Sequence, residues 1–562
     1  MENKIMEQYR MWVKNARYDT DVIDELNSIK TDEYKIEDAF YRDLAFGTGG
    51  LRGVIGAGTN RMNVYTVAKA SQGLADYVIK HFAPDDRKIA VSYDSRIKSD
   101  LFAQTASGVF AANGIKVYIY SQLMPTPCLS FAVRKLSCAA GIMVTASHNP
   151  SMYNGYKAYG SDGCQITAEA ADEILSEIQK LNIFEDVKAI SFEDGLDKGL
   201  IEYISEDIYT AFVEEVKKQS LADDSIDKNV AIVYSPLNGT GLKPVLRTLK
   251  ESGYTNITVV KEQEQPDGNF PTCPYPNPEI KEAMSLGVEY AQKHNADLLL
   301  ATDPDCDRVG IAVKNSDGEY VLISGNEVGL LLLDYICSRR VALGTMPDEP
   351  VFVKTIVTID MAERVAAKYG LRTINVLTGF KFIGEQIGFL EKQGKADSYV
   401  FGFEESYGYL SGSYVRDKDA VDAAFLICEM FAYYASQGLS LIDKLNELFD
   451  EFGYCLNTLH SYEFEGSKGF AKMQSIMEIF HNGLDSIGGK KVCDVLDYSK
   501  GLNGLPKSDV LKFLLEDNCS VVVRPSGTEP KLKTYISVSA ETRSDAEALE
   551  NRIVDEMKKY FA

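Results

Sequence analysis

Short apolar segments alternate with amphipathic stretches over most of the chain. Near the start, apolar residues 87–93 are followed by a helical pattern at 100–113 and a second apolar segment at 115–120. Short apolar runs rich in β-branched residues predict buried strands, and a period of 3.6 residues predicts helices. Because strands that are separated by helices usually form parallel sheets covered by those helices, this order predicts an α/β domain.

The same alternation recurs twice before the pattern changes. At 562 residues the chain is too long for one hydrophobic core, so we expect three to four domains of about 150 residues each. After about residue 450, two helical stretches and two strands follow without the regular alternation, which predicts a smaller α+β domain. The further α/β segments are 229–235, 242–252, 257–261, 296–302, 326–339, 351–357, 359–369 and 372–377, and the last elements are 467–482, 519–523, 533–539 and 543–559.

Composition and charge exclude several classes of protein. The hydrophobic share of 45% and the charged share of 25% are ordinary for a globular protein, and no apolar run is long enough to span a bilayer. The 59 basic and 82 acidic residues give a net charge of −23, which opposes nucleic-acid binding. The ten cysteines are scattered singly, and the charged N-terminus has no apolar signal segment. We therefore expect a cytoplasmic protein without nucleic-acid or membrane partners.

A serine follows one of the apolar segments in a position suited to chemistry. Residues 145–150 read TASHNP and come directly after the apolar residues 141–144. In α/β folds, sites gather at the ends of strands, and a serine hydroxyl becomes a nucleophile when a base or a cation assists it. Lys157, a few residues on, could supply that charge or a proton. An ordinary polar turn is the alternative interpretation, since Ser, Asn and Pro all favour turns.

Three aspartates follow a second apolar segment. Asp303, Asp305 and Asp307 come directly after LLLAT, and alternate residues of an extended loop would point the same way. Converging carboxylates repel one another unless a cation binds them, and hard oxygen ligands suit Mg²⁺. An EF-hand is excluded because neither its glycine nor its closing glutamate is in place. A solvated acidic turn is the alternative, but the position after a buried strand favours a metal site.

Three further segments become informative together with these two. Each could bind phosphate or sugar through glycine N–H groups, guanidinium, carboxylate or hydroxyl groups, although each alone could be an ordinary turn. A nucleophile loop, a metal loop and a separate phosphate-binding loop indicate an enzyme that holds one phosphate while another reacts. The segments are FGTGGLRG (46–53), GFEESYG (402–408) with RDKD (416–419), and RPSGTEPK (524–531).

These motifs resemble those of a known family. TASHNP with NGYK, then DPDCDR, GFEES and RPSGTEPK, in this order, resemble the four signature loops of the α-D-phosphohexomutase superfamily, and GTGGLRG resembles its N-terminal arginine loop. The resemblance runs from about residue 40 to the C-terminus. TGFK (378–381) and YPNPE (275–279) resemble the branch that contains bacterial phosphoglucomutases and the phosphoglucomutase/phosphopentomutase 2 enzymes.

The resemblance implies a heart-shaped architecture of three related α/β domains and a C-terminal α+β domain. We expect their limits at 1–205, 206–320, 321–445 and 446–562, with the phosphoserine, metal, sugar-binding and phosphate-binding loops in that order. The resemblance also implies phosphosugar substrates, Mg²⁺ as the cofactor and glucose 1,6-bisphosphate as intermediate and activator. A monomer or a homodimer is expected.

The resemblance also assigns roles to individual residues. Ser147 is expected to carry a phosphoryl group and to hold Mg²⁺ with Asp303, Asp305 and Asp307. Lys157 and Arg52 are expected beside the transferring group, and Lys418 is a candidate acid or base. The expected substrate-binding residues are Thr48, Arg52, His148, Arg308, Gly379, Lys381, Glu404, Ser406, Arg524, Ser526, Gly527 and Thr528.

The implied reaction is the interconversion of glucose 1-phosphate and glucose 6-phosphate. Mannose or pentose phosphates are the alternative substrates within the superfamily, because Phe403, the spacing of 408–418 and the lack of a histidine in 272–279 depart from many relatives. Two other classes of protein are alternatives to a mutase. A serine-dependent phosphatase would not use a second phosphate site. A non-catalytic sugar-phosphate-binding protein would not need Ser147 or all three aspartates.

Overall fold

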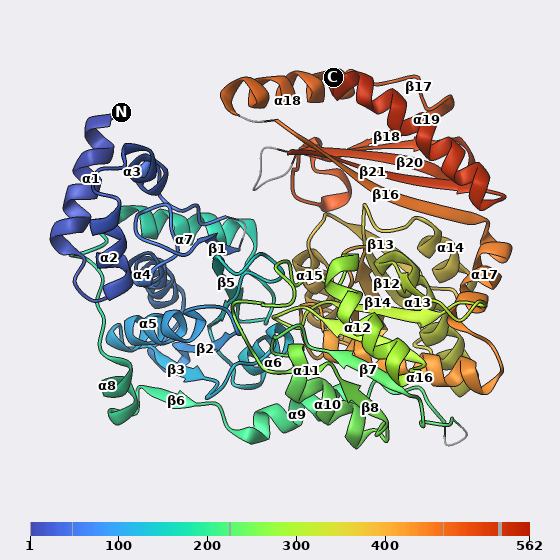
Figure 1. Cartoon of the computed structure of the whole chain (residues 1–562), viewed down its shortest axis with the longest axis horizontal. Coiled ribbons are helices and arrows are strands. Elements are labelled where there is room, and N and C mark those ends of the chain that lie inside the picture. The colour runs from blue at the N-terminus through green and yellow to red at the C-terminus, as the bar shows by residue number, and fades with distance from the viewer. Residues whose placement is uncertain (1, 48, 224–225, 465, 526–530, 562) are drawn as a thin grey trace. The chain divides into compact units, whose positions relative to one another are not determined.

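The computed structural model describes residues 2–47, 49–223, 226–464, 466–525 and 531–561 (Figure 1). The chain forms two compact units. The first comprises residues 1–323, 384–396 and 408–432, and the second comprises residues 324–383, 397–407 and 433–562.

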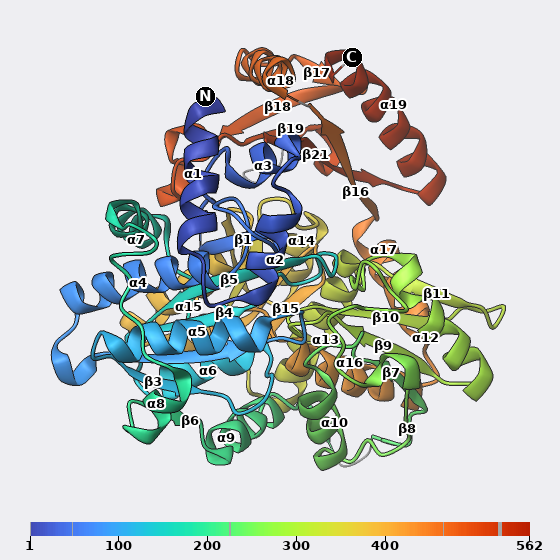
Figure 2. The same ribbon diagram turned by 60° about the vertical axis from the view of Figure 1, so that its left-hand side comes forward.

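Three N-terminal helices, which the sequence pattern did not predict, open the first unit. They are α1 (Glu2–Asn15), α2 (Thr20–Ser28) and α3 (Glu33–Phe40), and they lie together in Figure 2. Trp12 is fully buried among them and packs edge-on against the ring of Phe40. Asp19 and Asp32 cap the second and third helices by accepting backbone N–H groups, which satisfies donors that a helix start leaves free.

A six-stranded mixed sheet follows, in the order β1-β5-β4-β2-β3-β6. β2 pairs in parallel with β3 and β4, whereas β5 runs antiparallel to both β4 and β1. α4, α5 and α7 contribute to the apolar core against this sheet, and α6 packs on β2 and β4. The elements are β1 (Gly50–Val54), α4 (Val64–His81), β2 (Lys88–Tyr93), α5 (Ser99–Ala112), β3 (Lys116–Ile119), α6 (Thr126–Lys135), β4 (Ala140–Val144), β5 (Tyr153–Gly160), α7 (Ala168–Lys180), α8 (Phe192–Asp197) and β6 (Ile201–Tyr203).

The second sheet of this unit has the order β11-β10-β9-β7-β8. Its centre is again parallel, because β7 pairs with β8 and β9, and β10 and β11 complete one edge with antiparallel pairing. The elements are α9 (Glu206–Lys217), β7 (Ile232–Ser235), α10 (Leu242–Glu251), β8 (Ile257–Val259), α11 (Lys261–Glu264), α12 (Lys281–His294), β9 (Leu298–Thr302), β10 (Val309–Lys314) and β11 (Tyr320–Ile323). A later strand, β15 (Gly408–Ser411), also belongs to the first unit but is not part of this sheet.

The second unit begins with a third α/β arrangement. β12 pairs in parallel with β13 and β14, and Phe352, Phe401 and Phe403 form an aromatic cluster on these strands. Gly329 of α13 allows close approach, because a Cβ there would collide with the ring of Phe403. The elements are α13 (Gly325–Leu343), β12 (Val351–Thr355), α14 (Met361–Lys368), β13 (Arg372–Val376), β14 (Tyr399–Glu404) and α17 (Leu441–Phe452). The residues of α15 (Phe380–Lys392) and α16 (Ala420–Ser436) are divided between the two units.

An antiparallel sheet ends the chain, in the order β16-β21-β20-β19-β18-β17. α18 and α19 cover one face of it, as Figures 1 and 2 both show, and their apolar residues share a core with β19, β20 and β21. On β19, the amine of Lys512 donates to the carboxylate of Asp360 at 2.6 Å. The elements are β16 (Tyr454–Glu463), α18 (Gly466–His481), β17 (Ser486–Ile487), β18 (Lys490–Asp497), β19 (Leu511–Leu515), β20 (Cys519–Pro525), β21 (Lys531–Ala540) and α19 (Arg543–Phe561).

The predicted fold class is confirmed: three α/β arrangements precede a smaller α+β one. The pattern predicted the parallel centres of the sheets but not the two antiparallel strands at one end of each, which are β1 and β5 in the first sheet and β10 and β11 in the second. Within the described residues, no single helix has the length and hydropathy needed to cross a membrane; α16 and α17 satisfy that test only when they are counted together as one bent pair.

Candidate active site

Two β-hairpins of the first unit carry the predicted nucleophile and the predicted metal ligands. The Ser147 loop connects β4 to β5, in which Met143 lies opposite Lys157. The aspartate loop connects β9 to β10, where Thr302 lies opposite Val309. In each hairpin an apolar strand ends in a polar loop, and the antiparallel strand that returns supplies further residues of the site.

The side chain of Ser147 is buried and faces the aspartates. Its hydroxyl donates to Asp303 Oδ2 at 3.1 Å and lies 3.1 Å from His148 Nδ1. Ser147 has a φ of 54°, in the left-handed region that non-glycine residues seldom adopt. Its N–H is held by the Thr145 hydroxyl oxygen at 2.8 Å. The hydroxyl therefore has a fixed direction in the structure.

The three aspartates converge as predicted, but the reason given for it was wrong. One carboxylate oxygen from each of Asp303, Asp305 and Asp307 lies within 4.8 Å of the others, and all three residues are buried. The loop is not extended: it is a turn in which Cys306 has a φ of 50°. This turn, rather than the alternation of an extended strand, points the carboxylates the same way.

Two oxygens of this cluster are placed as a cation would use them. Asp305 Oδ1 and Asp307 Oδ1 are buried, and no group among the described residues makes a hydrogen bond to them. Burial, together with the charges of Asp305 and Asp307, raises the pKa of Asp303. Since a hard divalent cation prefers carboxylate oxygens and removes the repulsion between them, the cluster is suited to Mg²⁺.

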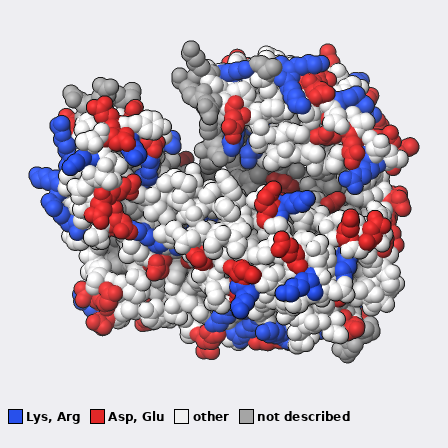
Figure 3. Space-filling model, in the orientation of Figure 1, with Lys and Arg blue, Asp and Glu red and all other residues white. Residues whose placement is uncertain are grey.

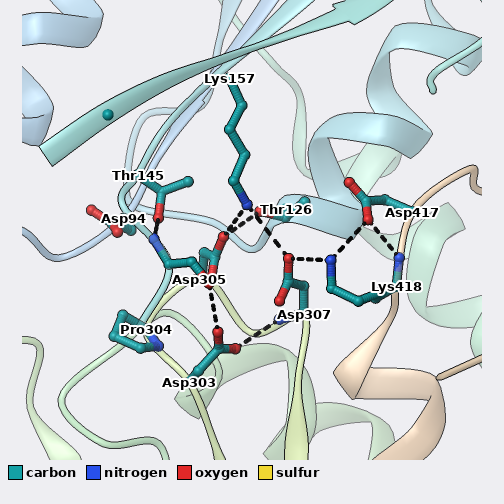
Figure 4. A network of polar contacts seen from close by, with 12 residues as sticks. Asp94, Thr126, Thr145, Lys157, Asp303, Pro304, Asp305, Asp307, Asp417 and Lys418 are labelled. Atoms are coloured by element: carbon teal, nitrogen blue, oxygen red, sulfur yellow. Dashed lines mark hydrogen bonds and ion pairs between the residues drawn. The ribbon is translucent and has the colours of Figure 1, made fainter. Parts of the chain in front are cut away.

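Two lysines border the aspartates, as Figure 4 shows. Lys157 Nζ lies 2.8 Å from Asp305 Oδ2 and 3.5 Å from Asp307 Oδ2, and Lys418 Nζ lies 3.0 Å from Asp307 Oδ2. Burial alone would lower the pKa of Lys157, but the two carboxylates raise it. Asp417 contacts Lys418 Nζ at 3.3 Å and is itself held by a hydroxyl group of Tyr159. Residues distant in sequence thus place two amines against the same cluster.

Arg52, His148 and Arg308, which were predicted to bind substrate, contact the serine loop or the aspartate loop. Arg308 donates its backbone N–H to Asp303 Oδ1 at 3.0 Å, and its guanidinium pairs with Glu279. Arg52, on β1, is exposed and donates to the side chain of Asn149, which follows His148 in the Ser147 loop, at 3.2 Å. These positive side chains are gathered locally, whereas acidic and basic residues are interspersed on the surface shown in Figure 3.

Other predicted residues belong to the second unit or lie outside the described residues. Gly379 donates its N–H to a carboxylate oxygen of buried Glu404 at 2.9 Å, so the structure brings these two together. The Arg524 guanidinium lies 5.9 Å from the centre of the Tyr535 ring. Lys381 is in α15 and Ser406 follows β14. Thr48, Ser526, Gly527 and Thr528 lie outside the described residues.

Sequence reasoning missed Thr126, which contacts the aspartate loop. Its hydroxyl donates to Asp305 Oδ2 at 3.1 Å, and its N–H donates to the Asp305 carbonyl at 3.0 Å. A contact of this kind fixes the orientation of the Asp305 carboxylate. The available signal was weak: Thr126 is a polar residue at the start of a helix that follows a predicted strand, as Ser147 and Asp303 also follow strands.

Comparison with family models decides the family. The models for the three alpha/beta/alpha domains of phosphoglucomutase/phosphomannomutase match residues 43–183, 209–318 and 324–452, and the model for the C-terminal domain matches residues 471–558. The chain belongs to the α-D-phosphohexomutase superfamily. It is therefore a phosphohexomutase, a mutase of the isomerase class.

Curated relatives agree with this phosphohexomutase assignment. The chain is 35% identical over 544 residues to the phosphoglucomutase of Staphylococcus saprophyticus, and the match covers 94% of the chain and 96% of the relative. It is 34% identical over 521 residues to the phosphoglucomutase of Staphylococcus haemolyticus, and that match covers 90% of the chain and 92% of the relative.

Solved structures share the phosphohexomutase fold. A putative phosphomannomutase from Thermus thermophilus matches with a TM-score of 0.68 at 22% identity, over 92% of this chain and 99% of that one. The open form of the phosphoprotein pp63/parafusin from Paramecium matches with a TM-score of 0.67 at 18% identity, over 92% of this chain and 95% of that one.

Proposed function

We propose that this phosphohexomutase is a phosphoglucomutase that interconverts glucose 1-phosphate and glucose 6-phosphate. The observation that carries the proposal is the buried Ser147 hydroxyl, which is directed at Asp303 beside two further aspartates and two lysines. The phosphoglucomutases that are 34–35% identical over nearly the whole chain support glucose as the sugar. TGFK and YPNPE support the branch with the phosphoglucomutase/phosphopentomutase 2 enzymes.

In this proposal Asp303, Asp305 and Asp307 hold Mg²⁺, together with an oxygen of the phosphoryl group on Ser147. Their buried oxygens that accept no hydrogen bond from the described residues support this assignment. When bound, the cation supplies positive charge to the phosphoryl oxygens, where negative charge gathers in the transition state. Lys157 lies beside these carboxylates, and Arg52 and Arg308 border the same loops, so they add positive charge to that region.

The first transfer breaks the bond between Ser147 Oγ and phosphorus and forms a bond from phosphorus to a sugar hydroxyl oxygen. The proton of that hydroxyl passes to Lys418, which we propose as the base and which must be neutral to accept it. Lys157 gives a proton to Ser147 Oγ as that oxygen leaves. The product is glucose 1,6-bisphosphate. After this intermediate turns around, the reverse steps return its other phosphoryl group to Ser147.

The other predicted residues supply the remaining substrate contacts in the proposal. The sugar hydroxyl groups are bound by Gly379, Lys381, Glu404 and Ser406. The Gly379 N–H already holds the Glu404 carboxylate, which fixes its orientation for this contact. The phosphate that is not reacting is bound by Arg524, Ser526, Gly527 and Thr528. The phosphate beside Ser147 is contacted by Thr48 and His148. We keep the domain limits at 1–205, 206–320, 321–445 and 446–562 as part of this proposal.

Free thiols support a cytoplasmic location. Cys493 is exposed and the other nine cysteines are buried, and none of the ten forms a disulfide. Because thiols persist in reducing compartments, this pattern is in keeping with the cytoplasm.

A panel of substrates tests the sugar assignment. We expect a higher kcat/KM for glucose 1-phosphate than for mannose 1-phosphate or ribose 1-phosphate, each assayed with a trace of bisphosphate.

Two variants test which residues bind phosphate and which read the sugar. Arg524→Ala should weaken the binding of all three substrates alike, by about 2–5 kcal/mol if its phosphate contact is buried and charge-paired. Glu404→Gln keeps a carbonyl oxygen that can accept the Gly379 N–H. It should change kcat/KM for the three substrates unequally, because a misplaced sugar hydroxyl leaves a buried polar group unpaired.

Two outcomes would overturn parts of this proposal. A higher kcat/KM for mannose or ribose phosphate in the unmodified enzyme would reject glucose as the preferred sugar. If Arg524→Ala changed the order of the three substrates and Glu404→Gln did not, the division between phosphate binding and sugar recognition would be wrong.

A further inference from the structure

Arg96 is a buried arginine just behind the Ser147 loop. It follows β2, and its side chain has no exposed surface. A buried guanidinium is costly unless its charge is paired and its N–H groups are used. Asp94 provides the charge, with its Oδ2 3.3 Å from Arg96 Nε, and the ring of Phe270 lies 5.1 Å from the guanidinium carbon.

The guanidinium N–H groups go to the backbone of one loop. Arg96 Nη1 donates to the carbonyl oxygens of Pro150 at 2.9 Å and Tyr153 at 3.1 Å. Its Nη2 donates to the carbonyl oxygens of Ser147 and Asn149. All four acceptors lie between Ser147 and the first residue of β5. A single side chain therefore determines the path of the hairpin loop that carries the nucleophile.

This path includes the uncommon backbone conformation of Ser147. A left-handed conformation at a non-glycine residue costs roughly 1–3 kcal/mol and persists only where its surroundings enforce it. The Ser147 N–H is held by Thr145 and its carbonyl is held by Arg96. Asp94, the charge partner of Arg96, also accepts the Arg96 backbone N–H at 2.9 Å and the Ser99 hydroxyl at 2.7 Å. Asp94, Arg96 and Thr145 thus fix the backbone on both sides of the Ser147 Cα.

We infer that Arg96 is a positioning residue that holds Ser147 in the left-handed conformation from which its Oγ faces Asp303. Because its side chain is enclosed and its N–H groups go to backbone carbonyls, Arg96 does not bind substrate phosphate. The inference rests on the proposed function only in treating Ser147 as the nucleophile. Phosphoryl transfer needs alignment, and a displacement of about 1 Å can cost about 100-fold in rate.

Arg96→Lys is the main test, since lysine keeps the charge but cannot reproduce a fork of N–H donors. We expect kcat for glucose 1-phosphate to fall about 100-fold with little change in KM, because alignment is lost while the phosphate-binding groups remain. Amide hydrogen exchange in residues 145–153 should become faster in the unliganded protein. Arg87→Lys is the matched control, because Arg87 also donates to two backbone carbonyls of the same domain, those of Phe82 and Ile79, but none in the Ser147 loop.

The inference is overturned if Arg96→Lys keeps the wild-type kcat, if its loop exchanges as slowly as in the wild type, or if Arg87→Lys causes the same loss of kcat. Should Arg96→Lys fail to fold, Thr145→Val decides, since it removes the oxygen that holds the Ser147 N–H. A lower kcat with faster exchange in 145–153 supports the inference, and an unchanged kcat rejects it.

The exchange measurement also separates this inference from the proposed function. If the wild-type protein never carries phosphate on Ser147, the proposed function fails. The exchange rates of residues 145–153 in Arg96→Lys and Arg87→Lys would still show whether Arg96 holds the loop.

Discussion

Replacing Ser147 with alanine is expected to lower kcat by about 10⁴-fold or more and to abolish phosphorylation of the protein, because the variant lacks the oxygen that accepts the phosphoryl group. The nearby Thr145 hydroxyl oxygen already accepts the Ser147 N–H at 2.8 Å, so it is held in the loop and is not placed to act instead. Initial rates with glucose 1-phosphate and intact-mass measurements after incubation with glucose 1,6-bisphosphate check this result.

Ser151→Ala is the matched control for this substitution. Ser151 belongs to the same hairpin loop, and its loss should leave the rate and the added phosphate mass close to those of the wild type. The mechanism is wrong if Ser147→Ala retains wild-type turnover, or if the added mass stays in Ser147→Ala and disappears in Ser151→Ala.

The second large effect is expected at the aspartate cluster. Asp305→Asn should weaken Mg²⁺ binding and lower activity by at least about 100-fold, since even outer contacts of metal ligands contribute 10–100-fold. The fold should survive, because the substitution relieves repulsion among three buried carboxylates, and Lys157 keeps a contact with Asp307 at 3.5 Å. Calorimetric titration with Mg²⁺, thermal unfolding and activity with and without a chelator measure the three effects.

Asp317→Asn provides the control for the loss of a negative charge. Asp317 lies in the exposed turn between β10 and β11, and its substitution should change neither Mg²⁺ affinity nor activity. Full activity of the wild-type enzyme in excess chelator, or unchanged Mg²⁺ affinity in Asp305→Asn, would contradict the metal assignment.

The parts of the fold that could be predicted from the sequence are those with a strong local pattern. β2, β7 and β9 are short apolar runs with fully buried centres, and α10 and α19 have clear apolar faces. β5 escaped prediction because its sequence, YNGYKAYG, lacks both an apolar run and a strict alternation. It is a strand because β1 and β4 pair with it on both sides, which is a property of the folded sheet.

The site was predictable where chemistry follows a strand directly in sequence. Ser147 and the three aspartates were found in this way, and the structure brings them together. The contact of Thr126 with Asp305 joins residues 179 positions apart, and Arg96 reaches Ser147 across 51 positions. Such contacts depend on how strands and helices pack, so no local pattern predicts them. The turn at Cys306 likewise depends on a backbone conformation that residue types do not specify.

The most direct test of the central claim follows a labelled phosphoryl group through one turnover. The enzyme is first labelled on Ser147 with radioactive glucose 1,6-bisphosphate, freed of excess label, and then mixed with unlabelled glucose 1-phosphate. We predict that the label leaves Ser147 and appears in glucose bisphosphate and glucose monophosphates, with almost none in inorganic phosphate. Release of the label mainly as inorganic phosphate would identify a phosphatase, and a failure to label Ser147 would contradict the account altogether.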